Sequence, residues 1–153
     1  MTVMERPEAE ETVRVSRLIP ASVEAVWCAW TTPEETKRWW GRSMGMECHL
    51  YEMDLKPGGV FRLGIRKPGA GDTHADVEGV MQRVEPPHTL VYTWSWTKDE
   101  PRVRDTLVTV SFHPEGDGQT RVSIVHERLP RGDVTEMHRE GWTAMLEDVA
   151  RAV

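Results

Sequence analysis

The chain has 153 residues, a formal net charge of −6 at pH 7 and 39% hydrophobic residues. This length predicts one domain with a sizeable core, and the mixture of acidic and basic residues argues against a nucleic-acid-binding surface. No apolar run is long enough to span a membrane, and the acidic N-terminus has no signal-peptide core. Cys28 and Cys48 lie in no metal-ligand spacing, so we expect a reduced, cytoplasmic protein without metal or cofactor.

The first part of the chain predicts a tail, a strand and two helices. Residues 1–11 are polar and are expected to form a flexible tail, and the single domain is expected to span residues 12–153. Alternating residues predict a strand over 12–19. Ser22 is placed to cap a helix that Pro33 stops, and Pro33 opens a second helix that ends at Trp40. Trp39 and Trp40 point about 100° apart on that helix, which makes the pair a candidate pocket rim.

The middle of the chain reads as strands joined by short turns. Lys56-Pro57-Gly58-Gly59 has the sequence of a type II turn. Successive hairpins favour an antiparallel sheet, so the predicted fold class is α+β with about six or seven strands. After the first strand, the expected strands are 47–55, 60–66, 74–84, 89–97, 106–113 and 120–128.

The last 21 residues, 133–153, predict one long amphipathic helix. Asp133 and Glu136 have the spacing of a capping box. Gly141 costs helix stability, and a close approach of the helix to the sheet would account for it, so Gly141→Leu is expected to force the helix away and destabilise the fold. Trp142→Ala is expected chiefly to alter ligand binding. The predicted apolar face contains Val134, Met137, Trp142, Met145, Val149 and Val153.

The aromatic residues give the strongest functional signal. The chain has seven Trp and eight Met but only two Phe and two Tyr. Strand alternation puts Leu90, Tyr92, Trp94 and Trp96 on one face, where they can face Trp142 and Met145 of the long helix. Large Trp and adaptable Met side chains suit either an irregular cavity or a dry core.

Polar candidates are fewer. His74, Asp76 and Glu78 alternate and could bind a metal or act as acid and base, but a solvated strand face is favoured. His126 is expected to point inward, where it could hydrogen-bond a ligand, although a core histidine bonded to the backbone is favoured. Arg62 could orient the polar end of a ligand. The sequence has no GxSxG elbow, and neither cysteine lies in a nucleophile motif.

A series of motifs resembles the family named after an activator of the heat-shock protein 90 ATPase, within the START-like, birch-pollen-allergen-like (SRPBCC) superfamily. The resemblance runs from about Val15 to the C-terminus and implies a helix-grip fold, in which a curved sheet closes around the C-terminal helix and leaves an apolar cavity. The motifs are Pro20, Val26-Trp27, Ala29, Thr32-Pro33-Glu34, Trp39-Trp40-Gly41, Lys56-Pro57-Gly58-Gly59, Gly79-Val80, Leu90 to Trp94, Gly118 to Arg121, Gly141-Trp142 and Leu146.

The family implies a carrier or sensor of a small hydrophobic molecule, lipid-like or aromatic and polyketide-like, without a chemical step. Two alternatives stay open: a cyclase or hydrolase that uses the same cavity, and a module that stimulates a chaperone ATPase as part of a stress response. A homodimer is also left open. The expected ligand-binding residues are Trp39, Trp40, Arg62, Tyr92, Trp94, Trp96, His126, Trp142 and Met145.

Overall fold

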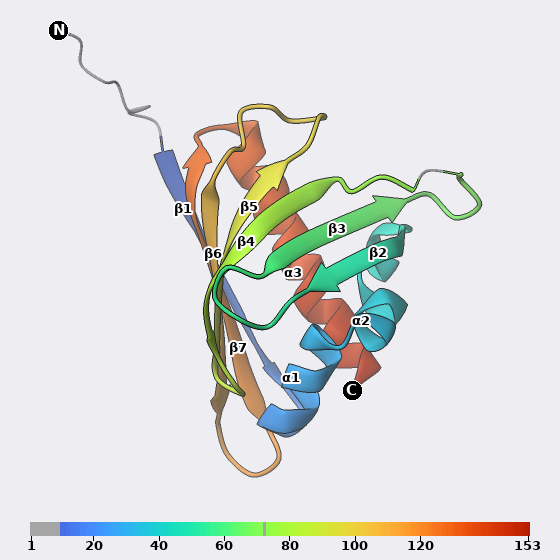
Figure 1. The fold of residues 1–153 in the computed structure, drawn as a ribbon. Coiled ribbons are helices and arrows are strands. Elements are labelled where there is room, and N and C mark those ends of the chain that lie inside the picture. Colours follow the sequence, from blue (N-terminus) through green and yellow to red (C-terminus); the bar gives the residue numbers. More distant parts are fainter. Residues whose placement is uncertain (1–9, 72) are drawn as a thin grey trace, which may run out of the picture.

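The sheet contains seven antiparallel strands. The computed structural model describes residues 10–71 and 73–153, and its strands are arranged in the order β1-β7-β6-β5-β4-β3-β2. Figure 1 shows the curved sheet with α3 lying along its concave side. The strands are β1 (Glu10–Ile19), β2 (Glu47–Met53), β3 (Val60–Arg66), β4 (Val77–Glu85), β5 (Thr89–Trp96), β6 (Thr106–Pro114) and β7 (Thr120–Pro130). The α+β helix-grip fold is therefore confirmed.

The helices lie close to the ranges that the sequence predicts. They are α1 (Val23–Thr31), α2 (Pro33–Trp39), the short 3₁₀ helix η1 (Arg42–Met44) and α3 (Asp133–Ala152). Ser22 caps α1, because its Oγ accepts a hydrogen bond from the Ala25 amide at 3.2 Å. The predicted capping box of α3 is wrong. Asp133 is already helical, and the residue before it, Gly132, has a φ of 111° and offers no side-chain cap.

Several strand boundaries differ from the prediction by one to three residues, and the differences at the starts of β1 and β4 change the assignment of residues named above. β1 includes Glu10 and Glu11, which pair with Pro130 and Leu129 of β7. The expected tail was 1–11, and residues 1–9 of it lie outside the described residues. β4 begins at Val77, three residues later than expected, so 74–76 form the approach to the strand.

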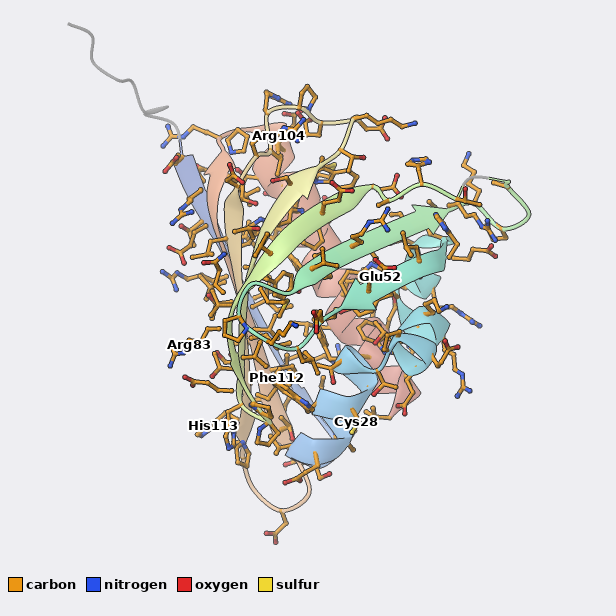
Figure 2. All side chains as sticks on the ribbon, in the orientation of Figure 1. Cys28, Glu52, Arg83, Arg104, Phe112 and His113 are labelled. Carbon is orange, nitrogen blue, oxygen red and sulfur yellow. The ribbon has the colours of Figure 1, made fainter. Side chains whose placement is uncertain are left out.

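The core lies between the concave face of the sheet and the helices. β6 and β7 alternate between buried and partly exposed residues along most of their length, which is the pattern of a sheet with one face covered. Figure 2 shows this at β6, where Phe112 lies on the helix side and His113 on the opposite side. α3 packs against β1 and β7, and α1 and α2 close one end of the sheet. A pocket remains between α3 and the strands β3, β4 and β5.

The structure also bears on membrane association. In residues 10–71 and 73–153, none of the helices combines the length and the apolar character needed to cross a membrane.

Candidate functional site

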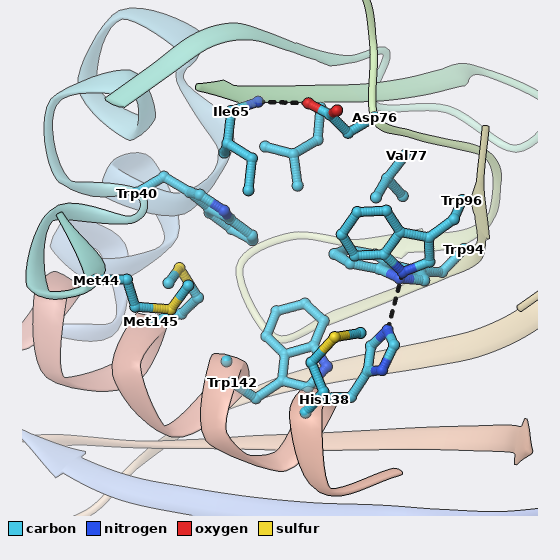
Figure 3. Close-up of a pocket in the computed structure, with 13 residues that line it drawn as sticks. Trp40, Met44, Ile65, Asp76, Val77, Trp94, Trp96, His138, Trp142 and Met145 are labelled. Carbon is cyan, nitrogen blue, oxygen red and sulfur yellow. Dashed lines mark hydrogen bonds between the residues drawn. The ribbon is translucent and has the colours of Figure 1, made fainter. Parts of the chain in front are cut away.

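An apolar pocket of about 160 Å³ lies between α3 and the sheet strands β3 to β5 (Figure 3). Its walls come from five separate segments, at residues 40–44, 63–65, 76–77, 94–96 and 137–145. The lining residues are Trp40, Met44, Leu63, Ile65, Asp76, Val77, Trp94, Trp96, Met137, His138, Gly141, Trp142 and Met145. Most of them are hydrophobic or aromatic, which is the usual character of a small-molecule site.

Secondary-structure periodicity places these side chains. Trp94 and Trp96 are two residues apart on β5 and therefore share the concave face. On α3, His138, Gly141, Trp142 and Met145 recur at steps of three and four residues or lie next to such a position, so they share the face toward the sheet. One stretch of strand and about two turns of helix thus provide much of the wall.

Two methionines mark where the pocket opens. Met44 is 47% exposed and Met137 is 44% exposed, although both also line the pocket. Deeper in, the indole rings of Trp94 and Trp142 lie with centroids 5.0 Å apart, and the Trp40 ring packs edge-on against Trp142 at 5.8 Å. The pocket is therefore an aromatic cleft with a flexible thioether at each side of its entrance.

A chain of hydrogen bonds fixes the floor of the pocket. Trp142 Nε1 donates to His126 Nδ1 at 3.0 Å, and His126 Nε2 lies 2.8 Å from Thr106 Oγ1. Thr106 Oγ1 in turn donates to the Trp94 carbonyl at 2.6 Å. The Thr106 hydroxyl proton is already donated to the Trp94 carbonyl, and His126 Nδ1 already accepts from Trp142. The imidazole proton therefore lies on His126 Nε2, which donates to Thr106 Oγ1. The indole of Trp142 is thus held in place by a neutral histidine.

His138 is fixed in the same way. Trp96 Nε1 donates to His138 Nε2 at 3.0 Å, as Figure 3 shows, so His138 Nδ1 carries the proton and donates to the Val134 carbonyl at 2.8 Å. Burial lowers the pKa of His138, and the Val134 carbonyl and Glu100 partly oppose this lowering. The pKa of His126 lies well below its ordinary value, mainly because the ring is buried and to a lesser extent because His138 is its neighbour. The two imidazoles, with centroids 5.1 Å apart, are both neutral at pH 7.

The pairing of both histidines bears on catalysis. Each ring uses both of its nitrogens in hydrogen bonds within the protein, so neither has a free lone pair or proton to offer a substrate. Within residues 10–71 and 73–153, no group of three His, Cys, Asp or Glu side chains could hold a metal ion. The arrangement is suited to orienting indole rings around an apolar guest.

Asp76 is the one carboxylate in the pocket wall, and the interpretation that it lies on a solvated strand face is wrong. It is 7% exposed, its Oδ2 accepts from the Ile65 amide at 2.8 Å, and its Oδ1 lies 3.0 Å from His74 Nε2. The expectation failed because β4 starts only at Val77, so strand alternation does not extend back to Asp76. Glu78, which is in the strand, is exposed and pairs with Arg62 at 3.7 Å, as a solvated face requires.

The structure brings five of the nine expected ligand-binding residues to this pocket. Trp40, Trp94, Trp96, Trp142 and Met145 line it, and their role in binding stays a prediction. The other four, Trp39, Arg62, Tyr92 and His126, lie elsewhere, although His126 supports Trp142 from behind.

Trp39 is a structural residue rather than a rim. Both Trp39 and Trp40 are buried, at 3% and 4% exposure, so the expectation that one of the pair sits at a margin is wrong. Trp39 Nε1 donates to the Ala29 carbonyl at 3.0 Å, which fastens α2 to α1. Helix α2 ends at Trp39, and Trp40 has an extended backbone with φ −62° and ψ 121°, so helical geometry does not govern its direction.

Arg62 and Tyr92 also lie away from the pocket. Arg62 sits on the outer face of the sheet, where it reaches Glu52 at 3.3 Å and Glu78 at 3.7 Å. Tyr92 is fully buried, with its ring 4.6 Å from Phe61, and burial raises its pKa despite the nearby Trp30 indole. Among the described residues, its hydroxyl makes no regular hydrogen bond. Tyr92 is therefore part of the dry core below the pocket.

Sequence reasoning missed several wall residues, and one of them had a usable signal. His138 precedes Trp142 by four residues, so the two share a helix face, and a histidine there is a candidate partner for an indole N–H. Met44, Ile65 and Asp76 carried no such signal, because each depends on where a loop or strand end is placed in three dimensions.

Gly141 lies against open space rather than against the sheet. A Cβ atom built at Gly141 would meet no atom within 4 Å outside its immediate helix surroundings, and Gly141 lines the pocket. The expected close approach at this position is therefore wrong, whereas the expected destabilisation by Gly141→Leu stays a prediction without that reason behind it. Trp142 is 3% exposed and bonded to His126, so Trp142→Ala would also remove a structural contact.

The curved seven-stranded sheet gripping a long C-terminal helix, with an apolar pocket between them, defines a helix-grip protein of the SRPBCC superfamily. Within it, the model of the family "Activator of Hsp90 ATPase homolog 1-like protein" matches residues 20–153, and the chain belongs to this family. No curated protein matches it.

Solved structures agree with this assignment. A Chromobacterium violaceum protein is 27% identical, with a TM-score of 0.79 over 93% of this chain and 96% of that one. An AHSA1-like protein from Aeromonas hydrophila is 25% identical, with a TM-score of 0.73 and 92% of both chains covered. An Hsp90 activator from Plasmodium falciparum is 24% identical, with a TM-score of 0.70 over 90% of this chain and 92% of that one. At this identity the match shows only that the two proteins share a fold.

Proposed function

We propose that this protein binds a small hydrophobic molecule in the pocket between α3 and β3–β5, without a chemical step of its own. The observation that carries the proposal is the apolar lining of a cavity of about 160 Å³ whose histidine and carboxylate side chains are already hydrogen-bonded within the protein. A ligand there would be bound by apolar burial and by contact with indole rings.

The volume narrows the ligand class. An apolar protein cavity of about 150 Å³ holds a benzene-sized guest. The pocket of about 160 Å³ therefore fits a single ring or a short branched chain, and a lipid or polyketide would have to extend through the entrance between Met44 and Met137. Small aromatic compounds are the class that the pocket favours.

A titration tests this proposal directly. Four of the seven tryptophans line the pocket, so toluene or 3-phenylpropan-1-ol should change Trp fluorescence saturably and raise the melting temperature through linkage. Gly141→Leu, which places a side chain in the open space of the pocket, should abolish both responses. Thr143→Leu is the matched control, because Thr143 is exposed two residues further along the same helix. Equal responses in the two variants would refute binding at this pocket.

An enzymatic role of the cyclase or hydrolase type has less support. Such chemistry requires a free acid, base or nucleophile in the cavity. Here the pocket's histidine and its carboxylate both have protein partners, and burial raises the pKa of Cys48 to about 11, so that its thiol stays protonated. The free cysteines Cys28 and Cys48 support a reducing, cytoplasmic location, which we propose together with the binding role.

Chaperone stimulation is the second candidate, favoured by the family description and by the fold shared with the Plasmodium falciparum Hsp90 activator. It is separable from ligand binding by experiment. Adding the purified protein to an Hsp90-type chaperone should accelerate ATP hydrolysis if this role is correct. An unchanged rate together with an intact fluorescence response to toluene would leave the binding role alone.

A further inference from the structure

A second, polar hollow adjoins the apolar pocket. It has a volume of about 430 Å³ and shares three wall residues with the pocket, namely Ile65, Asp76 and Trp96. Figure 3 shows Ile65 and Asp76 together on the β3 side of the pocket. A molecule that fills the apolar pocket and extends past these residues would therefore enter the polar hollow.

The charges that line the hollow differ from those of the molecule as a whole. The chain carries a net charge of −6, yet the hollow is lined by Arg66, Lys67 and Lys98 against Asp76 and Asp99. With three positive and two negative side chains, the described lining of the hollow sums to +1, with histidine counted as neutral, and to 0 when Glu47, the partner of Arg66, is included.

Internal pairing leaves the two lysines as the main available charges. Arg66 is bound to Glu47 at 2.6 Å, and the Asp76 carboxylate is held by the Ile65 amide and His74. Lys67 and Lys98 are both exposed, and neither forms an ion pair within the described ranges 10–71 and 73–153. Asp76 keeps its negative charge, but both of its oxygens are hydrogen-bonded, and Asp99 is the other carboxylate of the described lining. Because Lys67 and Lys98 are the lining cations without an ion pair, a ligand carboxylate is the group that can form new charge contacts there.

We infer that the ligand is an amphiphile with an apolar ring and a carboxylate end, the ring in the apolar pocket and the carboxylate in the adjoining hollow near Lys67 and Lys98. This inference rests on the proposed function and adds the ligand's second half. A carboxylate on a two- or three-atom linker would reach past Trp96 while its ring stays among the indoles.

Three probes of the same shape separate this inference from the proposed function. They are 3-phenylpropan-1-ol, 3-phenylpropanoate and 3-phenylpropylamine, titrated calorimetrically at pH 7.5 and low salt. The carboxylate should bind about 3- to 10-fold more tightly than the alcohol, as two partly exposed charge contacts allow, and the amine should bind more weakly than the alcohol. The preference for the carboxylate should shrink as salt is added.

Charge variants complete the test. The double variant Lys67→Gln/Lys98→Gln should lose the preference for the carboxylate and keep the affinity for the alcohol. The control Lys37→Gln/Lys56→Gln makes the same change in net charge away from the hollow and should keep the preference. If the alcohol and carboxylate bind the parent equally, or the amine binds best, the inference is overturned and the proposed function survives. If none of the three binds, both are overturned.

Discussion

Gly141 occupies an internal position of α3 where a glycine weakens the helix, and its lack of a side chain leaves space in the pocket. A methyl group there would meet nothing within 4 Å. Gly141→Ala should therefore raise the free energy of unfolding by about 0.5–1 kcal/mol, through helix propensity alone. Urea denaturation checks this, and a variant that is less stable than the parent would mean that the helix packs more closely than described.

A side chain at position 141 should have opposite effects on helix stability and on ligand binding. Because Gly141 lines the pocket, Gly141→Ala should also weaken the binding of a ring-sized ligand, by less than Gly141→Leu does. The sequence identified Gly141 as unusual for a helix interior, but the predicted reason was a close approach of the helix to the sheet. An open pocket calls for the same small residue, so the sequence could not separate the two reasons.

Trp142 is held by one hydrogen bond that can be tested by itself. Trp142→Phe keeps an aromatic ring but leaves His126 Nδ1, which is buried, without its donor. The expected loss of stability includes about 1–3 kcal/mol for that unpaired acceptor. Trp30→Phe is the matched control, because Trp30 is equally buried and its Nε1 has no hydrogen-bond partner in the described part of the chain. Equal losses in the two variants would show that the bond to His126 contributes nothing.

At the scale of elements, the His126–His138 pair joins β7 to α3 and should make the fold sensitive to acid. Both histidines have a pKa lowered in the folded state, whereas unfolded histidine titrates near ~6.5. Below that pH the unfolded chain binds more protons than the folded one, so the free energy of unfolding should fall as pH decreases from about 6.5 to 5. Above about pH 7 the pair should have no effect on the pH dependence.

Urea denaturation at pH 7.5, 6.5 and 5.5 measures this slope. His138→Gln should reduce it, because one of the two coupled histidines is gone, whereas His113→Gln, on the exposed face of β6, should leave it nearly unchanged. A parent protein equally stable at pH 7.5 and 5.5 would contradict the assignment of neutral imidazoles in the core.

The Asp148 side chain of α3 holds the 3₁₀ helix η1 by hydrogen bonds. The Ser43 amide donates to both carboxylate oxygens of Asp148, at 3.0 and 3.2 Å, and Asp148 is 3% exposed. Asp148→Ala should cost about 1.5–3 kcal/mol and loosen Met44 at the pocket entrance. Glu147→Ala, which removes only a surface pair with Arg151, is the control. Fast hydrogen exchange of the Ser43 amide in Asp148→Ala alone would support this, and unchanged exchange would oppose it.

Local patterns explain which elements the sequence could predict. Alternation in 89–97 correctly placed Leu90, Tyr92 and Trp94 in the core, and Ser22 and Pro33 correctly marked the helix starts. Asp76 and Trp40 were misjudged, because both lie just outside a regular element, where periodicity no longer determines the direction of a side chain. Most of the pocket wall comes from regular elements, and these two residues close the remainder, so the sequence predicted the aromatic content of the pocket better than its outline.

At the scale of the whole molecule, the fold leaves an apolar, aromatic pocket beside a polar hollow. Seven strands, ordered from β1 to β2 through β7, curve around α3, and the pocket lies where β3 to β5 face that helix. The sequence could indicate this architecture from its succession of hairpins and its long final helix. It could not indicate the volume of about 160 Å³, which depends on how closely the helix and sheet meet.

A crystal soaked with iodobenzene tests the central claim most directly, because the anomalous signal of iodine locates the ligand without reference to any model of binding. The ring should lie in the pocket against Trp94 and Trp142, and the iodine should be visible among the pocket residues of the parent and absent there in Gly141→Leu. An empty pocket in the parent at saturating iodobenzene, or an iodine peak only at the protein surface, would contradict the account.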